Sequence, residues 1–102
     1  MKDYYQAEWV ALNNVTTSTT SSSKEMMAYD YAELEVDSTT TTAWSGTVQI
    51  QGSIDNSTFY NYGDAVTAEG FYIIDPLPRY IRVVGTRDAG RLLVHVKPVM
   101  VK

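Results

Sequence analysis

The residues of this chain that could perform acid–base or nucleophilic chemistry are few. His95 is the only histidine among the 102 residues, and there is no cysteine. A serine nucleophile needs a neighbouring base and often sits in a Gly-x-Ser-x-Gly turn, a pattern that is missing here. His95 alternates with apolar residues, which is typical of a strand side chain that faces solvent or an interface. The sequence therefore predicts no catalytic residues and a protein that is not an enzyme.

Four aspartates could supply oxygen ligands to a cation, but each falls in a predicted turn. They are Asp55, Asp64, Asp75 and Asp88. Aspartate is favoured in turns because its short side chain hydrogen-bonds to the neighbouring backbone. A Ca²⁺ site built from two of them is the alternative interpretation. The turn interpretation is preferred, so the sequence predicts no bound metal and no cofactor.

The charges are unevenly distributed along the chain. Residues 1–78 carry two lysines against eleven acidic residues (net −9), whereas residues 79–102 carry six basic residues against Asp88 (net +5). A basic segment can bind nucleic acid, but these charges alternate with apolar residues and fit the solvent face of strands. No apolar run resembles a signal peptide or a membrane span. We therefore expect neither nucleic acid nor membrane as a partner.

Aromatic residues are the strongest indication of a binding role. Eight tyrosines and two tryptophans stand against two phenylalanines, and tyrosine combines an apolar ring with a polar tip that suits interfaces. Tyr, Trp and Arg also dominate interface hot spots. The predicted partner-binding residues are Trp9, Tyr29, Tyr31, Tyr60, Tyr62, Arg79 and Arg82. The aromatic run 59–62 could instead stack on sugar rings.

The elements that must position these side chains are short β-strands. Apolar and polar residues alternate, or aromatic and β-branched residues gather, in several segments bounded by turn-forming residues. The predicted strands are 4–12, 25–37, 47–54, 58–62, 71–74, 79–86 and 92–97. The predicted core comprises Val48, Ile50, Ile81, Val83, Leu92, Val94 and Val96. We expect a single all-β domain over residues 1–102, an antiparallel sandwich of seven or eight strands.

Some segments allow more than one interpretation. Residues 24–36 could form a helix, although alternation favours a strand that Asp30 interrupts with a bulge or a buried hydrogen bond. Ile54 continues the apolar face of 47–54, and Pro98 marks the end of the last strand or an edge.

The Ser/Thr-rich segments are predicted to be connections. Residues 16–23 read as an exposed loop that could separate an N-terminal arm within residues 1–23 from the sandwich, and 38–42 form a second polar connection. We expect deletion of residues 1–15 to leave the sandwich folded.

Three segments resemble a known group of domains. Gly52-Ser-Ile-Asp-Asn-Ser-Thr-Phe59 is similar to the hairpin of discoidin-type, galactose-binding-like jelly-roll modules, with Asn56 where glycine is usual. Pro78-Arg-Tyr-Ile-Arg82 resembles a later strand of these modules, and 90–96 resembles their closing strand. The same order occurs in small virion proteins of tailed phages. The resemblance covers about residues 45–97 and implies a jelly-roll-like β-sandwich.

The resemblance also implies a role. It indicates a non-enzymatic virion structural protein, a capsid decoration (cement) or accessory protein, assembled in the host cytoplasm. A disulfide-free domain of this size gains stability from assembly, so we expect a homo-oligomer, preferably a trimer, bound to the major capsid protein or another virion protein. The alternative is a carbohydrate-binding or host-adhesion module using the loops at 55–62 and 75–79.

Overall fold

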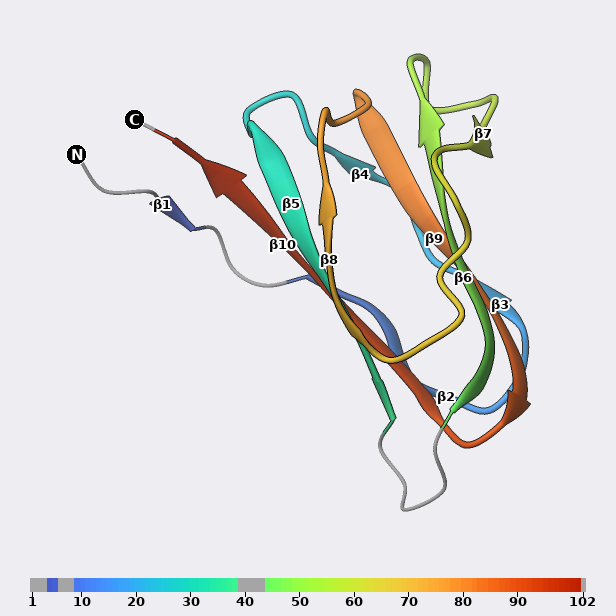
Figure 1. Cartoon of the computed structure of the whole chain (residues 1–102). Coiled ribbons are helices and arrows are strands. Elements are labelled where there is room, and N and C mark those ends of the chain that lie inside the picture. The colour runs from blue at the N-terminus through green and yellow to red at the C-terminus, as the bar shows by residue number, and fades with distance from the viewer. Residues whose placement is uncertain (1–3, 6–8, 39–43, 102) are drawn as a thin grey trace.

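Two antiparallel β-sheets face each other in the computed structural model, which describes residues 4–5, 9–38 and 44–101 (Figure 1). Sheet A contains β1 (Tyr4–Tyr5), β2 (Trp9–Val15), β5 (Tyr31–Ser38), β8 (Gly70–Ile74) and β10 (Leu92–Met100). Sheet B contains β3 (Thr19–Thr20), β4 (Lys24–Glu25), β6 (Ser45–Ser53), β7 (Tyr60–Asn61) and β9 (Tyr80–Ala89). The all-β prediction is confirmed, and the helix alternative for 24–36 is wrong. The strands outnumber the seven or eight predicted because four of them are only two residues long.

The strand order is that of a jelly-roll-like sandwich. In sheet A, β10 lies between β5 and the N-terminal strands β1 and β2, and β8 lies beyond β5. In sheet B, β9 lies between β6 and the short strands β3 and β4, and β7 lies beyond β6. The chain passes repeatedly from one sheet to the other, so neighbours within each sheet come from distant parts of the sequence.

The core lies between the sheets and is built from alternate residues of the long strands. All seven predicted core residues are buried, together with Leu12, Met26, Ala32, Leu34, Val36, Trp44, Ile74 and Val99. Gly85 allows the sheets to approach: an added Cβ there would lie 2.5 Å from Leu12 Cδ1 and 2.7 Å from Leu92 Cδ2. The period-two pattern therefore identified the buried face correctly in 47–50, 81–83 and 92–96.

The predicted strand 25–37 is divided by a corner. β4 pairs with β9 in sheet B, whereas β5 pairs with β10 and β8 in sheet A. The amide of Tyr29 donates to the carbonyl of Met26 (3.1 Å), and Val101 N–H donates to the Asp30 carboxylate (2.6 Å). Asp30 interrupts the apolar pattern because it caps this corner at the surface, so neither the bulge nor the buried hydrogen bond is its explanation.

The segment expected to be a separable arm belongs to the sandwich from residue 9 onward. β2 pairs with β10, and its Leu12 is only 1% exposed. β3 pairs with β9, and Ser21 exchanges two hydrogen bonds with Val83, each 2.8 Å. The Ser/Thr run is largely exposed, as predicted, but it also covers one side of β9 and does not uncouple residues 9–15 from the core. Residues 1–3 and 6–8 lie outside the described residues.

Two further expectations differ from the structure. Ile54 is exposed because β6 ends at Ser53, where the chain turns away from the core. Pro98 is buried inside β10 opposite Ala32, and the strand continues to Met100. A proline removes only its own ladder donor, so the strand can continue past it. Most of the predicted 38–42 connection falls in residues 39–43, outside the described residues.

Candidate functional site

A tightly hydrogen-bonded turn follows β6 at one end of the sandwich. Asp55 Oδ1 accepts from the amides of Ser57 (2.9 Å) and Thr58 (3.0 Å) and from the Ser53 hydroxyl (2.9 Å). The hydrogen bonds from Thr58 and Ser57 hold the pKa of the Asp55 carboxyl below its ordinary value because they stabilise the charged form. Asn56 adopts a φ of 61°, which asparagine tolerates better than most residues. The preference for a turn at Asp55 is thus supported by its hydrogen bonds.

A hollow of about 460 Å³ opens between this turn and the segment that precedes β9. Its lining is mainly apolar and comprises residues 52–55, Thr58, residues 60–62 and Pro78. Gly52 permits the close approach of the two segments, since an added Cβ would lie 2.7 Å from Pro78 Cγ. The Tyr62 hydroxyl donates to the Pro76 carbonyl and ties the hairpin to the same segment. The loops at 55–62 and 75–79, which are distant in sequence, therefore form one groove.

A polar ladder on the outer face of sheet B supports the groove. Arg82 Nε donates to Gln51 Oε1 (2.8 Å), and Gln51 Nε2 donates to Asn61 Oδ1 (3.0 Å). The Arg82 guanidinium also lies 4.2 Å from the centre of the Phe59 ring, a cation–π geometry. These contacts position Asn61 at the groove and hold the hairpin against β9.

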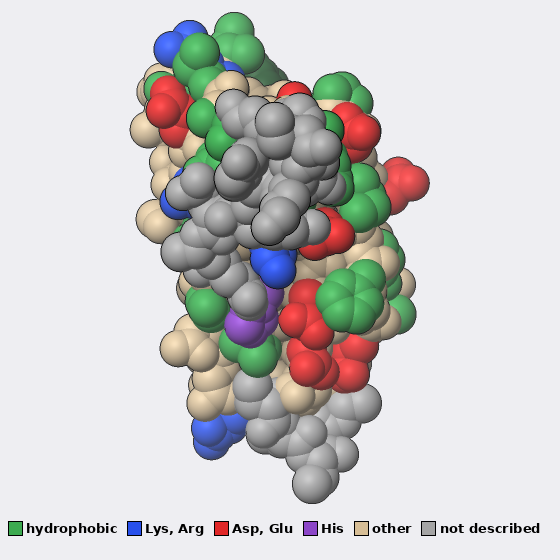
Figure 2. All heavy atoms as spheres, turned by 90° about the vertical axis from the view of Figure 1, so that its left-hand side faces the viewer, with side chains coloured by type: hydrophobic (Ala, Val, Ile, Leu, Met, Phe, Trp, Pro, Cys, Tyr) green, Lys and Arg blue, Asp and Glu red, His purple; other side chains and the backbone are tan. Residues whose placement is uncertain are grey.

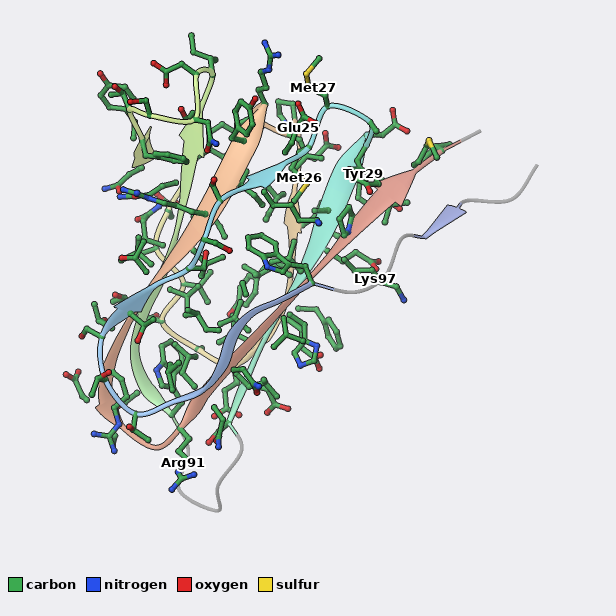
Figure 3. All side chains as sticks on the ribbon, turned by 180° about the vertical axis from the view of Figure 1, so that it is seen from behind. Glu25, Met26, Met27, Tyr29, Arg91 and Lys97 are labelled. Atoms are coloured by element: carbon green, nitrogen blue, oxygen red, sulfur yellow. The ribbon has the colours of Figure 1, made fainter. Side chains whose placement is uncertain are left out.

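The predicted partner-binding residues fall into two regions. Tyr60, Tyr62, Arg79 and Arg82 lie around the hairpin, and Tyr60 is 72% exposed at the groove. Trp9 belongs to β2, Tyr29 lies in the corner before β5, and Tyr31 is the first residue of β5. Trp9, Tyr29 and Tyr62 pack against the core and leave only part of each ring for a partner. In Figure 3, Met26 and Tyr29 lie on this corner segment, beside the more exposed Met27.

The outer face of sheet A combines charged and apolar side chains. Glu33 and Glu35 of β5 lie between Lys97 and His95 of β10 on one side and the apolar strand β8 on the other. Figure 2 shows the histidine beside acidic and hydrophobic side chains on this face. His95 is half-buried there and lines a small hollow with Phe71. Sequence reasoning identified 71–74 as a strand but missed that it is an exposed sheet edge, since pairing partners cannot be inferred from a single segment.

The described residues contain no group of three or more His, Cys, Asp or Glu side chains that could hold a metal ion. Within the same residues, no helix is long and apolar enough to cross a membrane. The two surface features described above are one apolar groove and one outer face of mixed charged and apolar side chains.

The fold that carries these surfaces is a small β-sandwich of two antiparallel sheets. No protein-family model and no curated protein sequence matches the chain. The fold is similar to the crystal structure of the SPBc2 prophage-derived protein YomS, with a TM-score of 0.80 over 97% of this chain and 96% of that one. The two sequences are 8% identical in this comparison, so the likeness concerns the fold.

Proposed function

We propose that this protein is a non-enzymatic structural component of a tailed-phage virion, located on the capsid as a decoration or accessory protein. The observation that supports this proposal is the fold shared with a prophage-derived protein over nearly the full length of both chains. Such a protein acts by docking, and the exposed Tyr60 and Arg79 offer hot-spot side chains to a neighbouring virion protein. Trp9, Tyr29, Tyr31, Tyr62 and Arg82 complete the proposed contact set.

The direct test is the composition of purified particles. Gradient-purified virions of the phage that encodes the chain should contain it in a fixed ratio to the major capsid protein. Particles made without it should regain that ratio when the purified protein is added. Its absence from particles whose other virion proteins are all detected would refute the proposal.

Variants would locate the docking surface. Tyr60→Ala and Arg79→Ala truncate exposed side chains and should reduce occupancy of the particles, whereas Arg91→Ala, an exposed control at the opposite end near Leu92, should not. Equal occupancy for all three would place the contact elsewhere on the sandwich.

The groove supports carbohydrate binding as a second candidate function. Its volume is within the range of small-molecule sites, and Tyr60 and Asn61 can supply a stacking ring and a hydrogen-bonding amide. Titration calorimetry with simple sugars would show saturable binding that Tyr60→Ala weakens. Binding by a monomer that ignores phage particles would favour this function over the first.

A further inference from the structure

Strand β8 forms an exposed and unpaired edge of sheet A. Within the described residues it pairs only with β5. Its sequence, Gly70-Phe-Tyr-Ile-Ile74, carries no charge. Phe71 and Ile73 point outward and are 78% and 61% exposed. A regular apolar edge of this kind presents both backbone hydrogen-bonding groups and apolar side chains to another strand.

The other sheet edges in the described part of the chain are interrupted. β3, β4 and β7 are two residues long. β2 changes register twice against β10, and its Asn14 has a φ of 58°. Short strands and irregularities of this kind discourage edge-to-edge pairing. β8 is five residues long and keeps a single register against β5 throughout, and its one residue with positive φ, Gly70 (149°), stands at its start. This distinguishes β8 as the edge suited to a partner.

Segment 62–66, which lies near β8, does not pack tightly against this strand. A hollow of about 230 Å³ lies between β8 and the segment 62–66, and its lining includes Tyr72, Ile73, Tyr62 and Val66. Leu34 of β5 and Ile50 of β6 also line this hollow, so it extends beneath β8 between the two sheets. Within the described residues, segment 62–66 forms no strand pairing with β8.

We propose that a second copy of this chain pairs with β8 in antiparallel fashion, about a two-fold axis that passes through Tyr72. This register places Phe71 opposite the partner's Ile73, and Ile73 opposite the partner's Phe71. Aromatic and β-branched residues directly opposite each other stabilise antiparallel strands. An axis perpendicular to the sheet keeps the two outer faces on the same side, so sheet A continues across the dimer. The segment is thus complementary to itself, as a two-fold interface requires.

The acidic residues of sheet A are compatible with this arrangement. Glu33 and Glu35 lie opposite Ile73 and Phe71 on β5. The two β5 strands would stand three strand spacings apart, about 14 Å, which exceeds the Debye length of about 8 Å at physiological salt. Glu69 and Asp75 flank β8, and in this register the Glu69 of each copy would lie opposite the Asp75 of the other. The Glu69 carboxylate already accepts a hydrogen bond from Trp44 N–H (3.1 Å). Salt would screen the repulsion between the acidic side chains that flank the two β8 strands.

The proposed dimer takes the place of the trimer expected from the sequence, and it does not depend on the virion role. Light scattering of the purified chain should give twice the chain mass of 11.4 kDa. Association should strengthen as salt rises from about 0.01 M to about 0.15 M, because the Debye length falls from about 30 Å to about 8 Å. Phe71→Lys should raise the dimer Kd at least about 30-fold, as expected for a hot spot.

Val10→Lys is the matched control, because Val10 is exposed in β2 at the opposite edge of the same sheet. It should leave the Kd unchanged, and circular dichroism should show both variants folded. A monomeric or trimeric wild type, or equal effects of the two substitutions, would overturn the proposal. If the wild-type chain forms the dimer but does not bind phage particles, the result would count against the proposed virion function and leave the dimer proposal intact.

Disulfide trapping tests the register, because the chain has no cysteine of its own. A mixture of Phe71→Cys and Ile73→Cys chains should form a covalent dimer, since these positions oppose each other across the interface. Neither variant alone should crosslink. Efficient crosslinking of Phe71→Cys with itself would move the axis to residue 71 and overturn the register centred on Tyr72.

Discussion

Replacing Leu12 by alanine tests whether the N-terminal strand β2 is part of the core or a detachable arm. The Leu12 side chain is 1% exposed and reaches across to β9, where it covers the backbone of Gly85. If β2 belongs to the sandwich, truncating this side chain leaves a cavity between the two sheets. If residues 1–15 were an arm, the same substitution would barely change the free energy of unfolding.

The expected magnitude follows from the atoms removed. Leucine loses three carbons on truncation to alanine, and each buried carbon contributes about 0.8 kcal/mol. The transfer term is therefore about 2.4 kcal/mol, and the cavity raises the total to about 3–4 kcal/mol. A domain of this size unfolds with about 5–15 kcal/mol. Leu12→Ala should thus remove a large fraction of the stability.

Urea unfolding followed by far-UV circular dichroism measures this loss. With a slope of about 1–3 kcal/mol per M, a loss of about 3–4 kcal/mol should lower the midpoint by about 1–4 M. Val10→Ala is the control on the same strand, because Val10 is 41% exposed, and it should cost well under about 1 kcal/mol. A loss for Leu12→Ala no larger than that of Val10→Ala would refute the packing of β2 against the core.

A second substitution sharpens the test. Gly85→Ala alone should destabilise, because the new Cβ would meet Leu12 Cδ1 and Leu92 Cδ2. Combined with Leu12→Ala, the added methyl enters the space that the leucine vacates. The double variant should therefore be more stable than the sum of the two single losses predicts, by about 0.5 kcal/mol or more. Strict additivity would contradict direct contact between these positions.

Three other outcomes are expected. Val94→Asp should abolish the β-sheet circular dichroism signal, because an unpaired carboxylate would replace a fully buried side chain; a folded variant would refute the placement of Val94. Because the pKa of Asp55 is lowered in the folded state, the folded state binds fewer protons, and the stability that this carboxylate contributes is lost as pH falls below about 4; Asp55→Asn should weaken the acid dependence of the urea midpoint. Ser21→Ala should cost about 0.5–1.5 kcal/mol, since the Ser21 hydroxyl accepts from Val83 N–H, whereas Ser22→Ala should be nearly neutral in the same urea assay.

The candidate site was only partly predictable. The sequence identified the hairpin, the turn at Asp55 and the aromatic residues of 59–62, because turn chemistry and strand alternation are local properties. It could not show that Pro78 closes a groove against Gly52, since this contact joins segments 26 residues apart. It also could not show that Trp9 and Tyr29 use much of their rings in the core.

The sequence by itself determined the all-β class and the buried faces of β6, β9 and β10. In each of these strands the side chains alternate between core and solvent, so residue types alone reveal which face is buried. Tertiary structure decided where the chain changes sheets, as at the corner that Asp30 caps, and which polar segment covers β9. It also decided that β8 is an edge, because a strand is central or exposed only through the distant segments that pair beside it.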